Sequence, residues 1–387
     1  MRLALLSVLL LGVACSSNKP PVQGEPDASG PEDSGSDAGT QPDGGVDPGD
    51  GGSGDDGGTG ADAGPGEEDA GSCEPPPSVR ESLLVPGLNN PRRLAVDATD
   101  IYISESHSLR PEAPEGEGQI LRLPRAGGGA TSVAKGFFAP DAIAVDEKNI
   151  YVLDQIGLWR VDKATGERGT VPIESSLNSV ITGGTDIRIG RLSGKDVLVV
   201  ATGRRRLVRV DTTGATPSSL VLFEGTVDTQ VRGARIDGTD VWFLVTGGTE
   251  PGLYRVPLDL DTPAQRVDAS ITTGTSLELT PTHFLITEGS GGTGRLLKRP
   301  RAGGEARVLA EGLQGPLFPV ELNGAVYFKD AVPRSSAFLR RTRGCPPGTS
   351  DAVGPEGTGP GGLIADGDTL LFTSQESGTG GAVGRVP

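Results

Sequence analysis

The sequence is poor in the residues that build many catalytic and metal sites. Its 387 residues include two His, three Cys, two Trp and one Met. No zinc Cys/His set with the usual ligand spacing is present, and the scarcity of Trp and His disfavours a quinone-dependent dehydrogenase. The chain also lacks a phosphate-binding loop and the Gly-x-Ser-x-Gly nucleophile elbow. These absences weigh against several enzyme classes.

Long hydrophobic runs and sustained positive charge are also missing. The apolar run at 3–14 is too short to span a bilayer, which takes roughly 20 residues. The net charge of −16 is concentrated in residues 16–77, which hold fifteen Asp and Glu against Lys19. Residues 78–387 carry only −3 and no basic stripe. We therefore expect no nucleic-acid partner.

Glycine and proline are abundant, at 61 and 31 residues. This composition favours many tight turns together with a disordered stretch, and it disfavours a helical bundle. Residues 16–77 contain no aromatic side chain. Such a segment cannot bury enough apolar surface to offset the entropy of ordering, so it is predicted to be a disordered Asp/Gly/Pro-rich tether.

The amino terminus has the pattern of a secretory signal. Arg2 precedes the apolar run, and small residues stand before Cys15. The stretch 11–15 resembles the bacterial lipobox, although Gly12 stands where that family prefers Leu, Val or Ile. The resemblance implies a signal peptide over 1–15, lipidation of Cys15 and, with Ser16 next, an outer-membrane lipoprotein. An ordinary signal peptide with an incidental Cys15 is the alternative.

The remainder of the chain repeats itself. Residues 91–103 and 140–152 share one spacing of a short strand, a polar turn and a β-branched strand, with looser copies at 236–243, 322–328 and 365–372. A third-strand sequence at 119–130 recurs at 295–306, and a fourth strand follows. Dividing 78–387 by seven gives about 44 residues, the period of a propeller blade. The prediction is an all-β β-propeller of seven four-stranded blades, or six if 178–226 is an insertion.

The two ends of the repeat region complete each other. The chain stops after a third strand at 384–387, and residues 82–87 look like a fourth strand with no unit before them. The amino-terminal strand is therefore predicted to complete the last blade, which would remove an exposed sheet edge.

The repeats resemble those of the NHL and YWTD propeller families. The runs Tyr-Val-Leu-Asp at 151–154 and Tyr-Phe-Lys-Asp at 327–330 stand where the latter family has its name motif, although the Trp is absent. The resemblance covers nearly all of 78–387 and implies the fold. Some NHL-like propellers are metal-dependent hydrolases or lactonases, which gives an alternative function.

With Cys15 lipidated, Cys73 and Cys345 form an even pair in an oxidising compartment. They are candidates for a disulfide that would hold the amino-terminal segment to the ring. Two free thiols are the alternative.

One face of the predicted ring gathers the loops that join fourth to first strands and second to third strands. The repeat alignment places on it the candidate ligand-binding residues Glu105, His107, Asp154, Glu288 and Asp330. Carboxylates that converge there could hold a calcium-type cation; solvated loop charges are the alternative. The aspartates of the first-to-second-strand turns belong to the opposite face, and Asp in a tight turn bonds its own backbone.

These features lead to one preferred function and one alternative. The first is a monomeric, non-enzymatic binding or scaffold module, anchored to the envelope membrane by lipid, that engages a protein, peptide or glycan through the loop-rich face. The alternative is a calcium-type metal-dependent hydrolase or lactonase. The sequence leaves open whether any catalysis occurs and predicts no other cofactor.

Overall fold

The strands of the computed structural model form seven four-stranded antiparallel sheets. The structure describes residues 81–107, 116–173, 184–212, 218–331, 337–343, 347–353, 360–375 and 380–387. All of these belong to one compact unit, residues 67–387. The predicted signal peptide, the tether, Cys15, Cys73 and Cys345 lie outside the described residues. Within the described ranges, no helix is long and apolar enough to cross a membrane.

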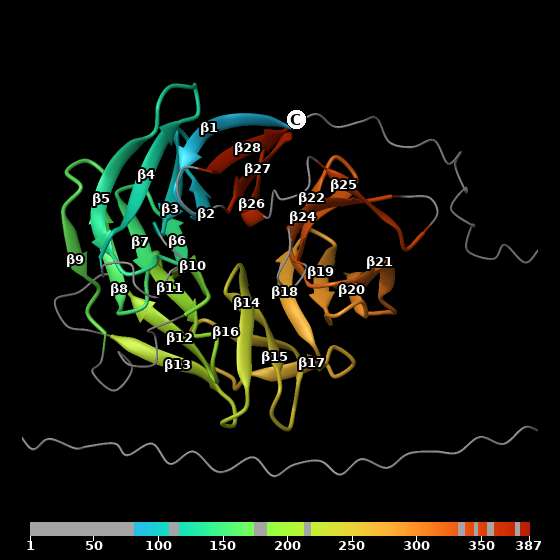
Figure 1. The fold of residues 1–387 in the computed structure, drawn as a ribbon. Helices are drawn as coiled ribbons and strands as arrows, with labels where there is room; N and C mark the ends of the chain where they lie inside the picture. The colour runs from blue at the N-terminus through green and yellow to red at the C-terminus, as the bar shows by residue number, and fades with distance from the viewer. Residues whose placement is uncertain are drawn as a thin grey trace, which may run out of the picture. The chain divides into compact units, whose positions relative to one another are not determined.

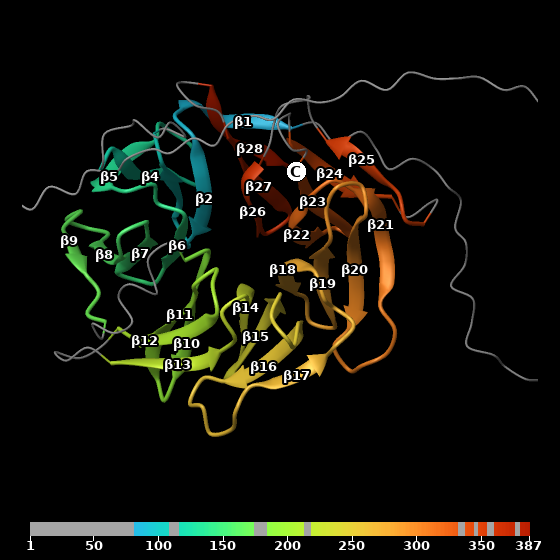
Figure 2. The same ribbon diagram turned by 60° about the horizontal axis from the view of Figure 1, so that its bottom comes forward.

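Each sheet is one blade of a β-propeller, arranged around a ring (Figures 1 and 2). Blade 1 comprises β2 (Pro91–Val96), β3 (Asp100–Glu105), β4 (Gly118–Pro124) and β5 (Thr131–Phe137). Blade 2 comprises β6 (Ala142–Val145), β7 (Asn149–Leu153), β8 (Leu158–Asp162) and β9 (Arg168–Thr170). Blade 3 comprises β10 (Asp186–Leu192), β11 (Lys195–Ala201), β12 (Arg206–Asp211) and β13 (Ser219–Glu224). Blade 4 comprises β14 (Gln230–Asp237), β15 (Asp240–Thr246), β16 (Gly252–Pro257) and β17 (Gln265–Asp268). Blade 5 comprises β18 (Gly274–Leu279), β19 (His283–Glu288), β20 (Gly294–Pro300) and β21 (Arg307–Leu313). Blade 6 comprises β22 (Pro316–Leu322), β23 (Ala325–Ala331), β24 (Ala337–Thr342) and β25 (Ser350–Val353), and blade 7 comprises β26 (Pro360–Asp366), β27 (Thr369–Ser374), β28 (Gly381–Val386) and β1 (Ser82–Leu88).

The amino-terminal strand closes the ring. β1 pairs antiparallel with β28, with Ser82 opposite Arg385 and Leu88 opposite Gly381 (Figure 1). The last blade is thus built from both ends of the repeat region, as the sequence predicts. The divergent stretch 178–226 contains the complete third blade, so the seven-bladed prediction is confirmed and the six-bladed one is wrong.

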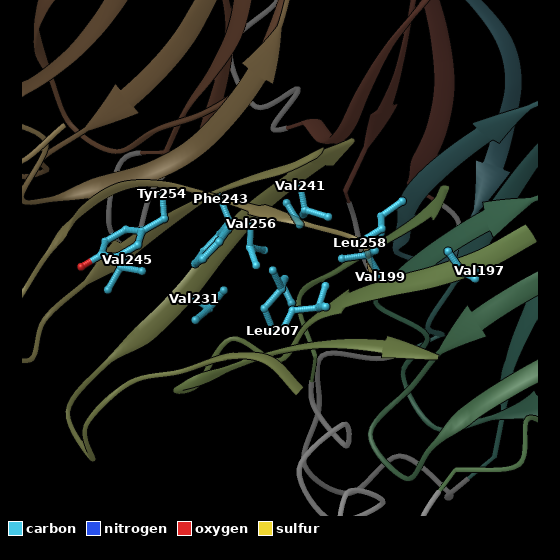
Figure 3. Packing of buried hydrophobic residues seen from close by; sticks show 13 residues of the cluster. Val197, Val199, Leu207, Val231, Val241, Phe243, Val245, Tyr254, Val256 and Leu258 are labelled. Carbon is cyan, nitrogen blue, oxygen red and sulfur yellow. The ribbon is translucent and has the colours of Figure 1, made fainter. Parts of the chain in front are cut away.

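The hydrophobic core lies between blades. The second strand of each blade is buried almost throughout, because its two faces pack against the two neighbouring blades. The described residues form seven apolar clusters, such as the one between blades 3 and 4 in Figure 3. In that cluster Val199 and Leu207 of blade 3 face Phe243 and Tyr254 of blade 4. Each blade therefore buries much of its apolar surface against its neighbours.

The seam between blades 7 and 1 depends on close backbone approach. A Cβ on Gly361 or Gly362 would lie 2.6 or 3.0 Å from the carbonyl oxygen of Arg92. That carbonyl also accepts a hydrogen bond from Thr373, at 3.1 Å. Within blade 7, Gly384 is buried against the ring of Phe372, where any Cβ would overlap the ring.

The turn aspartates of the opposite face are structural, as predicted. Asp97 accepts hydrogen bonds from the N–H groups of Thr99 (2.9 Å) and Asp100 (2.8 Å), and it contacts Lys163 Nζ of blade 2 at 2.5 Å. Burial raises the pKa of Asp97, but the Lys163 ammonium and the two N–H groups outweigh burial and hold the pKa below its usual value. Pairs that join neighbouring blades in the same way are Arg125–Asp366 and Arg301–Asp237.

We expect Gly384→Ala to lower the free energy of unfolding by about 1–3 kcal/mol, because the added methyl group must displace the buried Phe372 ring. Urea denaturation followed by fluorescence measures the change. Gly129→Ala is the matched control, since a Cβ on this exposed glycine meets no atom within 4 Å. Equal stability of both variants and the parent would contradict this account of the last blade.

Candidate functional site

The loop face of the ring consists of the loops that join fourth to first strands and second to third strands. A central channel with a volume of about 860 Å³ is lined by the innermost strands of all seven blades, β2, β6, β10, β14, β18, β22 and β26. Each inner strand contributes an apolar side chain to the lining: Leu94, Ile143, Ile189, Ile236, Leu279, Val320 and Leu363. Charged side chains from several of these strands share the channel with them.

An ion-pair network crosses three inner strands of the channel. Arg235 on β14 contacts Asp186 of β10 at 2.8 Å and Glu278 of β18 at 2.9 Å. Arg188 contacts Asp186 at 3.1 Å. Burial lowers the pKa of Arg235, but the two carboxylates outweigh it, so the net pKa is raised. Burial and the neighbouring Arg235 lower the pKa of Arg188. This part of the channel is a paired network that ties blades 3, 4 and 5 together.

Arg93 lies in a different environment. Its residue is part of a β-bulge in β2, where the register shifts between Pro91 and Leu94. Its guanidinium donates to the carbonyl oxygens of Asp141 (2.9 Å) and Gly361 (2.9 Å), and it lies over the ring of Phe318, 4.3 Å from the ring centre. These contacts come from blades 2, 7 and 6. Burial lowers the pKa of Arg93, while the more distant Asp141 and Asp186 carboxylates partly oppose the shift.

Lys329 on β23, the second strand of blade 6, is a second cation close to Arg93. Its Nζ lies 3.3 Å from Gln375 Oε1. Burial and the positive charges of Arg93 and Arg92 lower the pKa of Lys329 to about 8. Arg92 itself is paired with Asp141. Lys329 is thus held among like charges, which raises the free energy of its protonated form.

The predicted site residue Glu105 is buried at the end of β3. Its carboxylate accepts hydrogen bonds from the backbone N–H of Asn89 and from the Gln119 side chain, both at 2.5 Å. His107 Nε2 lies 3.1 Å from the same carboxylate. Glu105 therefore joins the loop at Asn89, which connects β1 to β2, to the second-to-third-strand loop of blade 1.

Asp154 and Asp330 occupy the equivalent position in blades 2 and 6. Asp154 is 1% exposed and accepts from the N–H groups of Phe138, Ile156 and Gly157 at 2.9–3.0 Å. Asp330 is also buried and accepts from the N–H groups of Gln314 and Gly315, both at 2.9 Å. Both carboxylates hold loop backbone rather than facing solvent.

Glu288, at the same position in blade 5, is buried and paired with Arg295. The five predicted site residues thus lie on four blades. Among the contacts shown between these five, one joins Glu105 to His107, which share blade 1. No group of three or more His, Cys, Asp or Glu side chains within the described ranges is placed to hold a metal ion. The hydrogen bonds of Glu105, Asp154 and Asp330 hold loop backbone. A ligand-binding role for the five residues stays a prediction.

The channel residues Arg93, Arg188 and Arg235, and Lys329 beside Arg93, were not among the predicted site residues. One signal for Arg93 exists in the sequence. The aligned copy of 91–94 at 140–143 has Ala142 at the position of Arg93, so a long cation replaces a small residue. The proximity of Lys329 to Arg93 has no such signal, because blades 6 and 1 are not sequence neighbours.

No protein-family model and no curated protein matches the sequence. Among solved structures, the Cps50 (Swd1) β-propeller domain of Myceliophteria thermophila is similar with a TM-score of 0.55 and 10% identity, covering 77% of this chain and 98% of that one. An oligogalacturonate lyase in complex with manganese is similar with a TM-score of 0.51 and 16% identity, covering 80% of this chain and 93% of that one. The AfRom2 CNH domain is similar with a TM-score of 0.53 and 9% identity, covering 80% of this chain and 99% of that one. At these identities the similarity establishes the β-propeller fold alone.

We expect Asp154→Asn to lower the free energy of unfolding by about 1–3 kcal/mol, because an amide cannot accept all three N–H groups that the carboxylate holds. Urea denaturation measures the loss. Asp228→Asn, at an exposed position in another loop of the same face, is the control and should leave stability within about 0.5 kcal/mol of the parent. An unchanged unfolding midpoint for Asp154→Asn would refute the loop-holding role.

Proposed function

We propose that this chain is an envelope-anchored β-propeller that binds a protein, peptide or glycan through its loop face. The observation that supports this most directly is the use of buried polar side chains to fix the loops. Glu105, Asp154 and Asp330 each accept hydrogen bonds from loop backbone groups. Loops held in one conformation lose less entropy when a ligand binds, so they suit recognition.

The loop face also carries large apolar side chains that solvent reaches. Val227, between β13 and β14, is 84% exposed, and Ile156, between β7 and β8, is 45% exposed. Both lie in loops of this face. They are single side chains in different loops, so they provide solvent-accessible positions at which the face can be tested.

Anchoring of this module rests on the amino-terminal sequence. A lipidated Cys15 followed by a flexible tether of about 60 residues would have a mean end-to-end distance of roughly 40–45 Å. That reach would allow the propeller to bind a ligand away from the membrane surface. More than one acyl chain gives a stable attachment.

The anchor is tested by metabolic labelling with an alkyne fatty acid in a Gram-negative host. The parent chain should become labelled and partition into detergent, and Cys15→Ala should abolish both. Cys73→Ala is the matched control and should keep the label. Labelling that survives in Cys15→Ala would show that Cys15 does not carry the lipid and would contradict the proposed anchor.

The binding face is tested by a photo-cross-linking residue placed at Val227, at Ile156 or, as a control, at Val267. Val267 is 44% exposed on β17, the outermost strand of blade 4, away from the loop face. With the full chain expressed in its envelope, we expect discrete cross-linked products from positions 227 and 156 and none from 267. Equal yields at all three positions would argue against a loop-face ligand.

A further inference from the structure

Positive charge outweighs negative charge around the channel among the described residues. The cations are Arg92, Arg93, Arg188, Arg232, Arg235 and Lys329, and the carboxylates are Asp141, Asp186 and Glu278. Glu321 also lines the channel but is paired with Lys298 at 2.7 Å. The paired network of blades 3, 4 and 5 contains both signs. Among the described residues, Arg93, Arg232 and Lys329 have no ion-pair partner. Arg232 contacts the Gln230 side chain of its own strand, whereas Arg93 and Lys329 lie close together.

Arg93 is held in place without being neutralised. The two carbonyl oxygens that it contacts, of Asp141 and Gly361, orient the guanidinium and leave other N–H groups of the side chain available. The ring of Phe318 supports one face of the guanidinium. A guanidinium fixed in this way presents a planar set of donors that matches a carboxylate.

Phe318 adopts a backbone conformation that bulky residues rarely take. Its φ is +54°, and it lies in a bulge of β22, where the register shifts between Leu317 and Val320. Such conformations persist where the surrounding structure enforces them, and they often occur at binding sites. Here the bulge places the ring beneath Arg93.

Lys329 adds an ammonium group close to this guanidinium. Its Nζ lies 3.3 Å from Gln375 Oε1, and the Gln375 side chain packs against Gly361, whose carbonyl oxygen accepts from Arg93. Burial, together with the charges of Arg93 and Arg92, lowers the pKa of Lys329 to about 8. Two like charges brought together in a partly buried place are unfavourable unless an anion joins them. A bound anion would therefore offset the repulsion between Arg93 and Lys329.

We propose that the mouth of the channel at Arg93 and Lys329 binds a carboxylate group of the ligand. The proposal rests on the loop-face function above. Arg93 lies two residues after the start of β2 and Lys329 two residues before the end of β23, and these are the strand ends that join loops of that face. The guanidinium provides paired N–H donors, and the ammonium provides a second positive contact. An acidic sugar or a peptide carboxylate both offer this group.

Calorimetric titration of the full mature chain at constant ionic strength tests the site. The probes are glucuronate for an acidic sugar, N-acetylglycine for a peptide carboxylate, inorganic phosphate for a different oxyanion, and glucose as the neutral counterpart of glucuronate. We expect saturable binding of at least one carboxylate and weaker binding of phosphate, with no binding of glucose. The tighter of the two carboxylates identifies the source of the group. No carboxylate binding, or a preference for phosphate, would overturn the proposal.

Two variants separate binding from stability. Lys329→Met should weaken carboxylate binding by about tenfold or more. The same change should raise the unfolding midpoint of the free protein, because it removes a buried charge beside two guanidinium groups. Arg93→Gln should also weaken binding. Lys135→Met removes an exposed charge on β5 and should change neither property. Parental affinity in Lys329→Met would overturn the assignment.

The pH dependence gives an independent readout. The groups facing Lys329 are Arg92 and Arg93 from β2 and Gln375 after β27. Asp330 is the next residue of β23 and pairs with Arg340. The arginines stay charged, and glucuronate stays ionised, between about pH 7 and pH 10. Affinity in the parent should therefore fall as pH rises through the range where Lys329 loses its proton. The affinity of Lys329→Met should be flat over the same range.

The two proposals can fail separately. Cross-links at Val227 without carboxylate binding would leave the loop face as the binding surface and remove the anion site. Carboxylate binding that Lys329→Met abolishes, without cross-links at Val227 or Ile156, would retain the anion site and limit the ligand to the channel mouth.

Discussion

Closure of the ring is the constraint on which the rest of this structure depends. Each blade buries its two faces against its neighbours, so an open ring would leave two sheet faces exposed to water. Pairing of β1 with β28 supplies the missing fourth strand of the last blade. Glycines at the seam let blade 7 approach the Arg92 backbone closely. The channel exists because all seven inner strands are held at a fixed distance from a common axis.

Closure also explains the different roles of the charged residues. At the ends of the second strands, Glu105, Asp154 and Asp330 are surrounded by loop N–H groups and are buried. A buried carboxylate needs such donors, and these loops supply them. On the opposite face, Asp97 and Lys163 join neighbouring blades. These four carboxylates, which the repeats place in loops and turns, therefore stabilise the propeller itself.

The channel mouth differs because its charges are not balanced locally. Asp186, Arg188, Arg235 and Glu278 form a network in which each charge has an opposite neighbour. Arg93 instead contacts carbonyl oxygens and an aromatic ring, and Lys329 contacts an amide. Local departures from the rule that buried charges are paired are expected mainly where a protein binds something. This contrast within one channel is the reason for placing ligand recognition there.

The sequence by itself determined the propeller, its seven blades and the closure by the amino-terminal strand, because the repeat spacing and the incomplete units at both ends are local patterns. It also placed Glu105, Asp154 and Asp330 on the loop face. Only the tertiary structure decided what these residues do, since loop N–H groups of adjoining segments occupy their carboxylates. The meeting of Arg93, Phe318 and Lys329 was likewise decided by the ring, which brings blades 1 and 6 together across more than 200 residues of chain.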